Sequence, residues 1–224
     1  MVNFPGKGNA YAEYVAANAD HMALKPSNIS HNEAAAAALA CLTAWQVLQQ
    51  VQLKAHSKVL IYGASGGVGH YATQIVNFLG YEVTGVSSEK NKAFVLSNGA
   101  HHHIDHSQVD AFDALADFDL VVDVVGKRSV LELAKPLANG GKLITIVNQN
   151  IPEKEITYLK TSGVEAFSML VQSSGRDMAK IADLLERGVI RSHVSHIYDF
   201  QHMGDAHLQL ETGRTIGKIV VQVI

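Results

Sequence analysis

Two hydrophobic periods alternate along the chain. Short β-branched apolar runs, the pattern of buried strands, are followed by stretches with an apolar residue every three or four positions, the pattern of amphipathic helices. The clearest case begins with the apolar run at residues 59–62, stops at Gly63, and resumes at helical spacing over residues 68–79. This order predicts a strand, a glycine-rich turn and a helix.

The same alternation continues along most of the chain. Ser30 and Glu33 form a capping-box pattern, which predicts that an alanine-rich helix begins there and runs to Gln50. Strands that alternate with helices indicate parallel βαβ units, and therefore an α/β fold with a doubly wound parallel sheet. Further strands are expected at residues 81–86, 103–105, 118–125, 142–147 and 164–171, and further helices at 89–98, 127–137 and 176–187.

The two ends of the chain depart from this alternation. Residues 1–29 predict short strands and turns. The segment from His193 predicts a strand, a helix over residues 203–210 and a strand over residues 216–224. We expect this last segment to break the βαβ rhythm.

The turn after the first strand carries three evenly spaced glycines. Gly63, Gly66 and Gly69 form G-x-x-G-x-x-G, a variant of the dinucleotide-binding pattern G-x-G-x-x-G. Such glycines let a pyrophosphate approach the backbone, where the free N–H groups and the positive dipole end of the next helix hold it. Glycines also mark ordinary turns, so a purely structural turn is the alternative. The flanking strand and helix favour a pyrophosphate loop made of Gly63, Ala64, Ser65, Gly66, Gly67, Val68 and Gly69.

The end of the second strand bears on which dinucleotide would bind. NAD-binding units place an acidic residue there to hold the ribose 2′-hydroxyl. Here the position is Ser87, followed by Ser88, and these small hydroxyl residues leave room for a 2′-phosphate. Lys92, and less directly Lys90, supplies a counter-charge from the next helix. This favours NADP(H), whereas Glu89, at nearly the usual spacing from the glycine loop, favours NAD.

Composition limits the classes of function. The 224 residues are 47% hydrophobic and 17% charged, which suits a globular protein with a real core. The net charge of −3 provides no basic field for nucleic acid, and no apolar run approaches the ~18 residues of a membrane helix. The single cysteine, Cys41, excludes an internal disulfide and indicates a reducing, cytoplasmic compartment. We therefore expect neither nucleic acid nor a membrane as a partner.

A run of histidines from His101 to His106 offers an alternative chemistry. Imidazoles at alternating positions of a strand can converge on one metal ion. The simpler interpretation is a short strand after Gly99 with exposed polar side chains. Because no cysteine or second-shell partner is visible, we expect no metal site.

Seven stretches of the chain together match a known family. They are residues 4–15, 33–45, 63–69, 98–105, 118–126, 139–143 and 212–220, and they cover essentially the whole chain in the family order. On these stretches the chain resembles the medium-chain dehydrogenase/reductase superfamily, and within it the zinc-independent quinone oxidoreductases. A short-chain dehydrogenase is rejected because no Tyr-x-x-x-Lys pair exists.

The resemblance implies a domain organisation. Residues 30–192 would be the dinucleotide-binding Rossmann domain, and residues 1–29 and 193–224 a small remnant of a GroES-like catalytic domain, most of which the chain lacks. Relatives commonly dimerise through a sheet edge, so a homodimer is expected through the strand between Val164 and Val171.

The resemblance also implies a function and further site residues. The expected function is metal-free hydride transfer from NADPH to a small-molecule quinone or activated alkene or carbonyl, with no catalytic acid assigned; a catalytically inactive or regulatory NADPH-binding remnant is the alternative. Further cofactor contacts are expected from Thr43, Val124, Val125, Gly126, Val147, Asn148 and Arg214. Thr43 has a simpler alternative, as a helix residue bonded to its own backbone.

Overall fold

The computed structural model describes residues 3–108 and 112–223. The chain divides into two compact units, which are described separately. The first, here called the sheet unit, consists of Val47–Ser65 and Ala72–Leu170. The second, here called the terminal unit, consists of Met1–Gln46, Gly66–Tyr71 and Val171–Ile224. The domain boundaries expected from the sequence stay a prediction.

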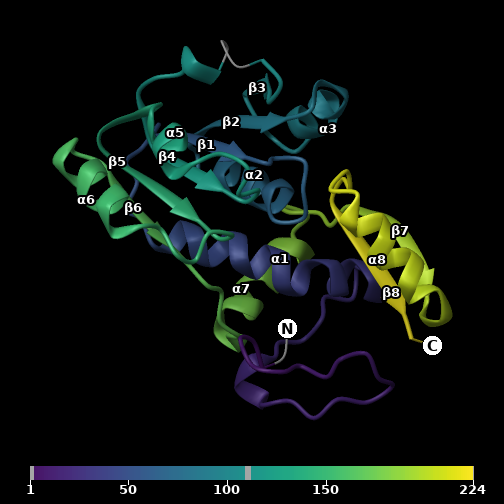
Figure 1. The fold of residues 1–224 in the computed structure, drawn as a ribbon. Coiled ribbons are helices and arrows are strands. Elements are labelled where there is room, and N and C mark those ends of the chain that lie inside the picture. Colours follow the sequence, from purple (N-terminus) through teal and green to yellow (C-terminus); the bar gives the residue numbers. More distant parts are fainter. Residues whose placement is uncertain (1–2, 109–111, 224) are drawn as a thin grey trace. The chain divides into compact units, whose positions relative to one another are not determined.

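A six-stranded sheet, parallel throughout, forms the centre of the sheet unit (Figure 1). The strand order is β3-β2-β1-β4-β5-β6, with β1 in the interior and β3 and β6 at the edges. The predicted doubly wound α/β fold is confirmed. The strands are β1 (Lys58–Tyr62), β2 (Glu82–Ser87), β3 (His102–Asp105), β4 (Phe118–Asp123), β5 (Leu137–Thr145) and β6 (Glu165–Ser168).

The interior strands are apolar because both faces of a parallel sheet are covered. Leu60 in β1, Val121 in β4 and Leu143 in β5 have no exposed surface. They belong to one apolar cluster with residues from the helices and loops around the sheet, among them Leu133 and Leu159. The alternation of apolar runs seen in the sequence therefore reports burial on both sides of the sheet.

Short helices connect and cover the strands. After α2 (Gly69–Phe78) and the 3-10 turn η2 (Glu89–Asn91), α3 (Lys92–Ser97) packs against β2 and β3. Next, α5 (Val130–Ala134) packs against β4 and β5, and α6 (Glu153–Thr161) packs against β6. Among the described residues, no helix combines the length and apolar character that crossing a membrane requires.

The terminal unit is built from helices and a separate two-stranded sheet. Helix α1 (His31–Gln49) begins at the predicted capping box, where the Glu33 amide donates to Ser30 Oγ at 3.1 Å and the Ser30 amide donates to Glu33 Oε2 at 2.7 Å. The other elements are η1 (Ala19–His21), α7 (Gly175–Glu186), β7 (Val194–Asp199), η3 (Phe200–His202), α8 (Met203–Glu211) and β8 (Lys218–Gln222).

Each prediction for the chain ends is wrong in one part, although the strand, helix and strand predicted after His193 are present as β7, α8 and β8. Between residues 3 and 30 the structure has turns, bends and η1 in place of short strands. Tyr14 and Leu24 are 90% and 93% exposed there, so their apolar character does not report a packed strand. At the other end, β7 and β8 pair in parallel with α8 between them, so the segment is itself a βαβ unit.

Three further elements differ from the prediction. The expected helix over 127–137 is present only as α5, because β5 begins at Leu137, before the strand expected at 142–147, and continues through Gly140 and Gly141. The strand expected between Val164 and Val171 is present as β6, but it spans only Glu165–Ser168. Helix α6 was missed because it is mostly polar and Leu159 is its buried residue. The expected homodimer stays a prediction, although β6 does lie at a sheet edge.

A buried carboxylate fixes the chain where β4 ends. Asp123 is 2% exposed. Its Oδ1 accepts hydrogen bonds from the amides of Val125 at 2.9 Å and Gly126 at 3.0 Å. Its Oδ2 accepts from Thr145 Oγ1 in β5 at 3.0 Å. Hydrogen bonds to a carboxylate are stronger than neutral ones, so this side chain holds the turn after β4 against β5.

Removing this carboxylate should therefore destabilise the protein. We expect Asp123→Ala to lower the free energy of unfolding by about 3 kcal/mol, because three donors, among them the buried Thr145 hydroxyl, lose their charged acceptor. Asp123→Asn, which retains one carbonyl oxygen for the two amides, should cost clearly less. Urea denaturation of both variants measures the difference, and equal losses would contradict the assignment.

Candidate functional site

Gly63 ends β1 in a conformation that only glycine adopts easily. Its φ is +100°, and a Cβ there would lie 2.8 Å from Val124 Cγ2 and also overlap the Val125 side chain. The amides of Gly63 and Ala64 both donate to the carbonyl of Val86 at 3.0 Å, which ties the turn to the end of β2. The first glycine of the motif therefore serves the fold, and these two amides are already used.

The next amides of the turn are unused. Within the described residues, the backbone N–H groups of Ser65, Gly66, Gly67 and Val68 donate to no other group. They directly precede α2, a helix of 10 residues whose first turn carries a partial positive charge. Consecutive unpaired donors at a helix N-terminus suit an anion.

In the terminal unit, Lys218 lies beside Gly67 of this turn. A Cβ on Gly67 would lie 3.0 Å from Lys218 Cδ and 3.6 Å from its Nζ. Burial lowers the pKa of the Lys218 ammonium. Among the described residues, no carboxylate forms an ion pair with this group. A partly desolvated cation without a counter-ion is unfavourable, so this position favours an anionic ligand.

His70, in the first turn of α2, is completely buried. Its Nδ1 lies 2.9 Å from the Gly66 carbonyl, and its Nε2 lies 3.5 Å from the His193 amide. A neutral ring with its proton on Nδ1 satisfies both contacts, since one partner accepts and the other donates. Burial is the main cause that lowers the pKa of His70 to about 4.

In the sheet unit, Asn91 presents an unsatisfied polar atom beside the turn. Asn91 is 6% exposed, and its Nδ2 donates to Ser65 Oγ at 3.0 Å. Its Oδ1 is buried and has no hydrogen-bond partner among the described residues. A buried carbonyl oxygen of this kind is normally paired, so it is available to a donor group of a ligand.

The residues expected to hold a 2′-phosphate lie where β2 ends. Ser87 is its last residue, and Ser88 precedes η2. Ser87 Oγ lies 2.9 Å from His103 Nε2, and Ser88 Oγ lies 3.1 Å from His106 Nε2. Lys92 Nζ lies 3.3 Å from Glu89 Oε1, in an exposed ion pair. The structure therefore brings the expected lysine, the rival carboxylate and two histidines to one strand end.

The turns after β4 and β5 lie at the same, carboxyl-terminal edge of the sheet. Val124 and Val125 follow Asp123, and Gly126 has a φ of +73° with its Cβ direction towards Val147. The amides of Val147 and Asn148 both donate to Thr145 Oγ1, at 3.3 and 3.2 Å. In open α/β sheets this edge is where ligands bind. The five predicted residues therefore lie at the edge that the prediction requires.

The last two predicted contacts belong to the terminal unit. Thr43 is buried in α1, and its hydroxyl donates to the Leu39 carbonyl at 2.8 Å, as its simpler alternative describes. Arg214 is exposed in the turn before β8, with its amide bonded to Thr212 Oγ1. Their contact with a cofactor stays a prediction.

Burial raises the pKa of the Cys41 thiol well above its usual range, so it is no nucleophile.

Sequence reasoning missed three residues of this region: Asn91, His103 and Lys218. Asn91 lies between Lys90 and Lys92, and nothing in the sequence around it indicated that its side chain would be buried. Lys218 belongs to the stretch that resembles the family, where its position directly before an apolar run was a usable signal. His103 was expected to be an exposed polar residue of a short strand, with metal ligation as the alternative, and this expectation is wrong because its side chain is 1% exposed.

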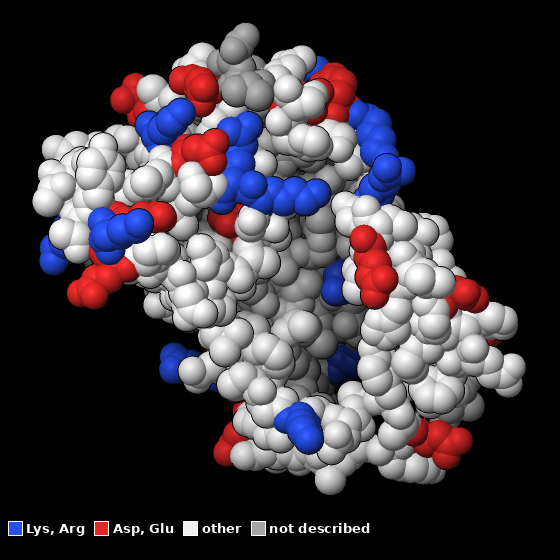
Figure 2. All heavy atoms as spheres, in the orientation of Figure 1, with Lys and Arg blue, Asp and Glu red and all other residues white. Residues whose placement is uncertain are grey.

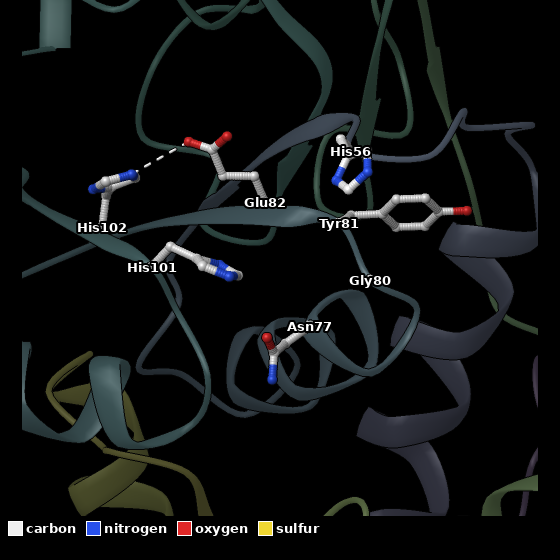
Figure 3. A pocket seen from close by; sticks show the side chains of 7 residues that line it. All are labelled: His56, Asn77, Gly80, Tyr81, Glu82, His101 and His102. Atoms are coloured by element: carbon white, nitrogen blue, oxygen red, sulfur yellow. Dashed lines mark ion pairs between the residues drawn. The ribbon is translucent and has the colours of Figure 1, made fainter.

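The histidine run is divided between two places. His101 and His102 line a hollow of about 510 Å³ together with His56, Tyr81 and Glu82, where His102 Nε2 lies 3.2 Å from Glu82 Oε1 (Figure 3). This hollow lies where β2 and β3 begin, opposite the edge with the glycine turn. Within residues 3–108 and 112–223, no three His, Cys, Asp or Glu side chains are placed to hold a metal ion.

Acidic and basic side chains are mixed on the surface. On the face drawn in Figure 2, Lys and Arg stand among Asp and Glu, without a broad region of one sign. This agrees with the small net charge of −3.

Comparison with known proteins identifies the family. Residues 98–221 match the family model described as zinc-binding dehydrogenase. The chain belongs to the zinc-binding dehydrogenase family. It is therefore a member of the medium-chain dehydrogenase/reductase superfamily, as the sequence predicted.

Curated proteins and solved structures are similar to the chain over most of its length. The chain is 30% identical to 2-methylene-furan-3-one reductase of Solanum lycopersicum, covering 98% of this chain and 54% of the relative. It is 28% identical to the mouse mitochondrial NAD(P)H oxidoreductase RTN4IP1, covering 98% and 63%. The quinone oxidoreductase structure from Coxiella burnetii matches with a TM-score of 0.88 and 30% identity, covering 96% of this chain and 68% of that one.

The chain covers only part of the length of these relatives. It spans about half to two thirds of the length of the two curated relatives. One of them is named as mitochondrial, so the cytoplasmic location stays a prediction.

The neutral state of His70 should make stability fall in acid. An unfolded histidine titrates near pH 6.5 and His70 near pH 4, so the unfolded chain binds more protons between these values and stability falls as the pH drops through them. We expect about 2 kcal/mol to be lost at pH 5 from this group. Urea denaturation at pH 7 and pH 5 should show a smaller pH effect in His70→Gln, and identical pH effects would contradict this.

Proposed function

We propose that this chain carries the cofactor-binding part of an NADP(H)-dependent oxidoreductase that transfers hydride from NADPH to a quinone or an activated alkene or carbonyl, without a metal. The observation that carries the proposal is the run of amides at Ser65–Val68 that have no acceptor within the described part of the chain, with Lys218 beside Gly67 in the terminal unit. Both features attract a doubly charged group such as a pyrophosphate.

The residues present fit such a cofactor on a second observation. The buried Oδ1 of Asn91 lacks a donor, and a ribose or adenine N–H or O–H group is one. Bound NADPH would supply the hydride. This chain's own residues would bind and orient it, with Val124, Val125 and Val147 offering apolar surface at the sheet edge.

The choice of NADP over NAD rests on the end of β2. Ser87 and Ser88 supply hydroxyl groups where an NAD-binding unit has a carboxylate. Lys92 supplies the positive charge, and its exposed partner Glu89 is held by a surface ion pair that is weak enough to be exchanged for a phosphate. Glu89 is also the residue that would hold the ribose if NAD were preferred.

The relatives and general chemistry support the proposed substrate class. The relatives named above include a quinone oxidoreductase and a reductase of an activated alkene. Without a metal to polarise a carbonyl, the substrate itself has to be electrophilic. No side chain is assigned as proton donor, so the proposal gives this chain a binding and orienting role.

Loss of Lys92 should weaken binding of NADPH only. We expect Lys92→Ala to raise the NADPH dissociation constant by about 10- to 150-fold, equivalent to about 1.5–3 kcal/mol, because a charge-assisted contact with the 2′-phosphate is lost. NADH lacks this phosphate, so its dissociation constant should change less than about twofold. Fluorescence titration with each nucleotide measures both.

Lys218→Met is the matched comparison for Lys92→Ala. It removes a charge beside the pyrophosphate, which both nucleotides share, so NADPH and NADH should weaken by similar factors. If Lys92→Ala weakens NADH as much as NADPH, the phosphate assignment is wrong. If Glu89→Gln abolishes NADH binding while NADPH is unaffected by Lys92→Ala, NAD is the cofactor.

Turnover separates an enzyme from a binding module. We expect NADPH oxidation, followed at its absorbance maximum, when the protein is mixed with a panel of quinones and α,β-unsaturated ketones. A chelator should leave the rate unchanged. Tight NADPH binding without oxidation of any panel member would instead show a catalytically inactive, NADPH-binding module.

A further inference from the structure

His103 is placed to control the hydroxyl group at the end of β2. It lies on β3 next to β2, and its side chain is 1% exposed. Its Nε2 lies 2.9 Å from Ser87 Oγ, and Ser87 is itself only 5% exposed. His103 is therefore a buried residue that contacts a hydroxyl group predicted to bind the cofactor, and not an exposed polar residue of the surface.

The other ring nitrogen of His103 faces a carboxylate. Nδ1 is buried and has no hydrogen-bond partner among the described residues, and Glu89 Oε2 lies 3.7 Å from it. In the neutral ring, a proton on Nδ1 faces this negative charge favourably, whereas a bare Nδ1 lone pair would face it unfavourably. The neutral ring therefore carries its proton on Nδ1, and Nε2 accepts from Ser87.

This arrangement uses the single proton of the Ser87 hydroxyl. While that proton is donated to His103, Ser87 Oγ can only accept a hydrogen bond from a ligand. A ribose 2′-hydroxyl can donate such a bond, but a 2′-phosphate dianion cannot. The Ser88 carbonyl, 3.2 Å from Ser87 Oγ, is a second acceptor for the hydroxyl proton. When His103 is protonated, its Nε2–H donates to Ser87 Oγ, and the hydroxyl proton is then shared between the Ser88 carbonyl and a phosphate oxygen, which as a charged group is the stronger acceptor.

We propose that His103 is a positioning residue for cofactor choice: by its contact with Ser87 it sets whether this hydroxyl accepts or donates, so the preference for NADPH over NADH increases as the pH falls. This inference rests on the proposed function, and it adds regulation at the same site.

The charged neighbours of His103 come from three elements. Glu89 lies on η2, Lys92 on α3 and Asp105 on β3; the carboxylates favour the imidazolium and the ammonium opposes it. Burial outweighs these charges and lowers the pKa of His103 below its usual value. The ring is therefore neutral at pH 7 without a ligand, and a 2′-phosphate, as a further negative charge, raises this pKa when it binds.

The test compares three proteins over a range of pH. The dissociation constants of NADPH and NADH are measured at pH 5.5, 6.5, 7.5 and 8.5 for the unaltered chain, His103→Gln and His102→Gln. Glutamine retains hydrogen-bonding groups but does not titrate. His102 is the preceding residue on β3, and it pairs with Glu82, the first residue of β2. It therefore serves as the matched control. The cofactor phosphate and His106 are common to all three proteins, so they do not account for a difference between them.

We expect the NADPH preference of the unaltered chain, divided by that of His103→Gln, to rise about tenfold or more from pH 8.5 to pH 5.5, the factor for one hydrogen bond to a charged group. His102→Gln should follow the unaltered chain. A ratio that stays constant while NADPH binds tightly overturns the role of His103 and leaves the proposed function intact. Absence of NADPH binding to every protein at every pH overturns the proposed function itself.

A second measurement uses the unaltered protein and does not depend on a variant that folds. The pKa of His103 is followed by NMR of its ring protons, alone and with saturating NADPH or NADH. We expect NADPH to raise this pKa and NADH to leave it nearly unchanged. Equal pKa values with both nucleotides would contradict the proposal.

Discussion

The pairing of β1 with a parallel strand on each side is the constraint on which the sheet unit depends. β1 pairs with β2 and with β4, and four of its five residues are buried. Parallel strands align their carboxyl ends, so the turns after β1, β2 and β4 come to one edge of the sheet. The amides of Gly63 and Ala64 both donate to the carbonyl of Val86, so the turn after β1 is tied directly to the end of β2.

Buried side chains then hold the turns in shape. Asp123 accepts the amides of Val125 and Gly126 and the hydroxyl of Thr145, so it ties the turn after β4 to β5. Asn91 donates to Ser65 and links η2 to the glycine turn. Each of these contacts uses a polar group that would otherwise be buried without a partner, which is why these turns have a defined conformation.

The polar groups around the glycine turn and those at the end of β2 have different electrostatic states. The amides of residues 65–68 are unpaired among the described residues, and Lys218 in the terminal unit has no counter-ion there, so both lack a negative charge. At the end of β2, in contrast, Glu89 already lies near Lys92 and His103. The unpaired amides and Lys218 therefore suit any pyrophosphate. The end of β2 carries both a carboxylate, which suits a ribose hydroxyl, and a lysine, which suits a phosphate.

The sequence by itself determined the order of elements, the class of fold and the position of the glycine turn, because hydrophobic period and glycine spacing are local properties of the chain. It also predicted Ser87 and Lys92 as ligand contacts, because one lies at the end of the second strand and the other at the start of the next helix. The parallel pairing of β7 with β8, the buried Asn91 and the contact of His103 with Ser87 were decided only by the tertiary structure. Each of them depends on residues that are distant in sequence, and a local pattern carries no record of which side chains the strand pairing will bury together.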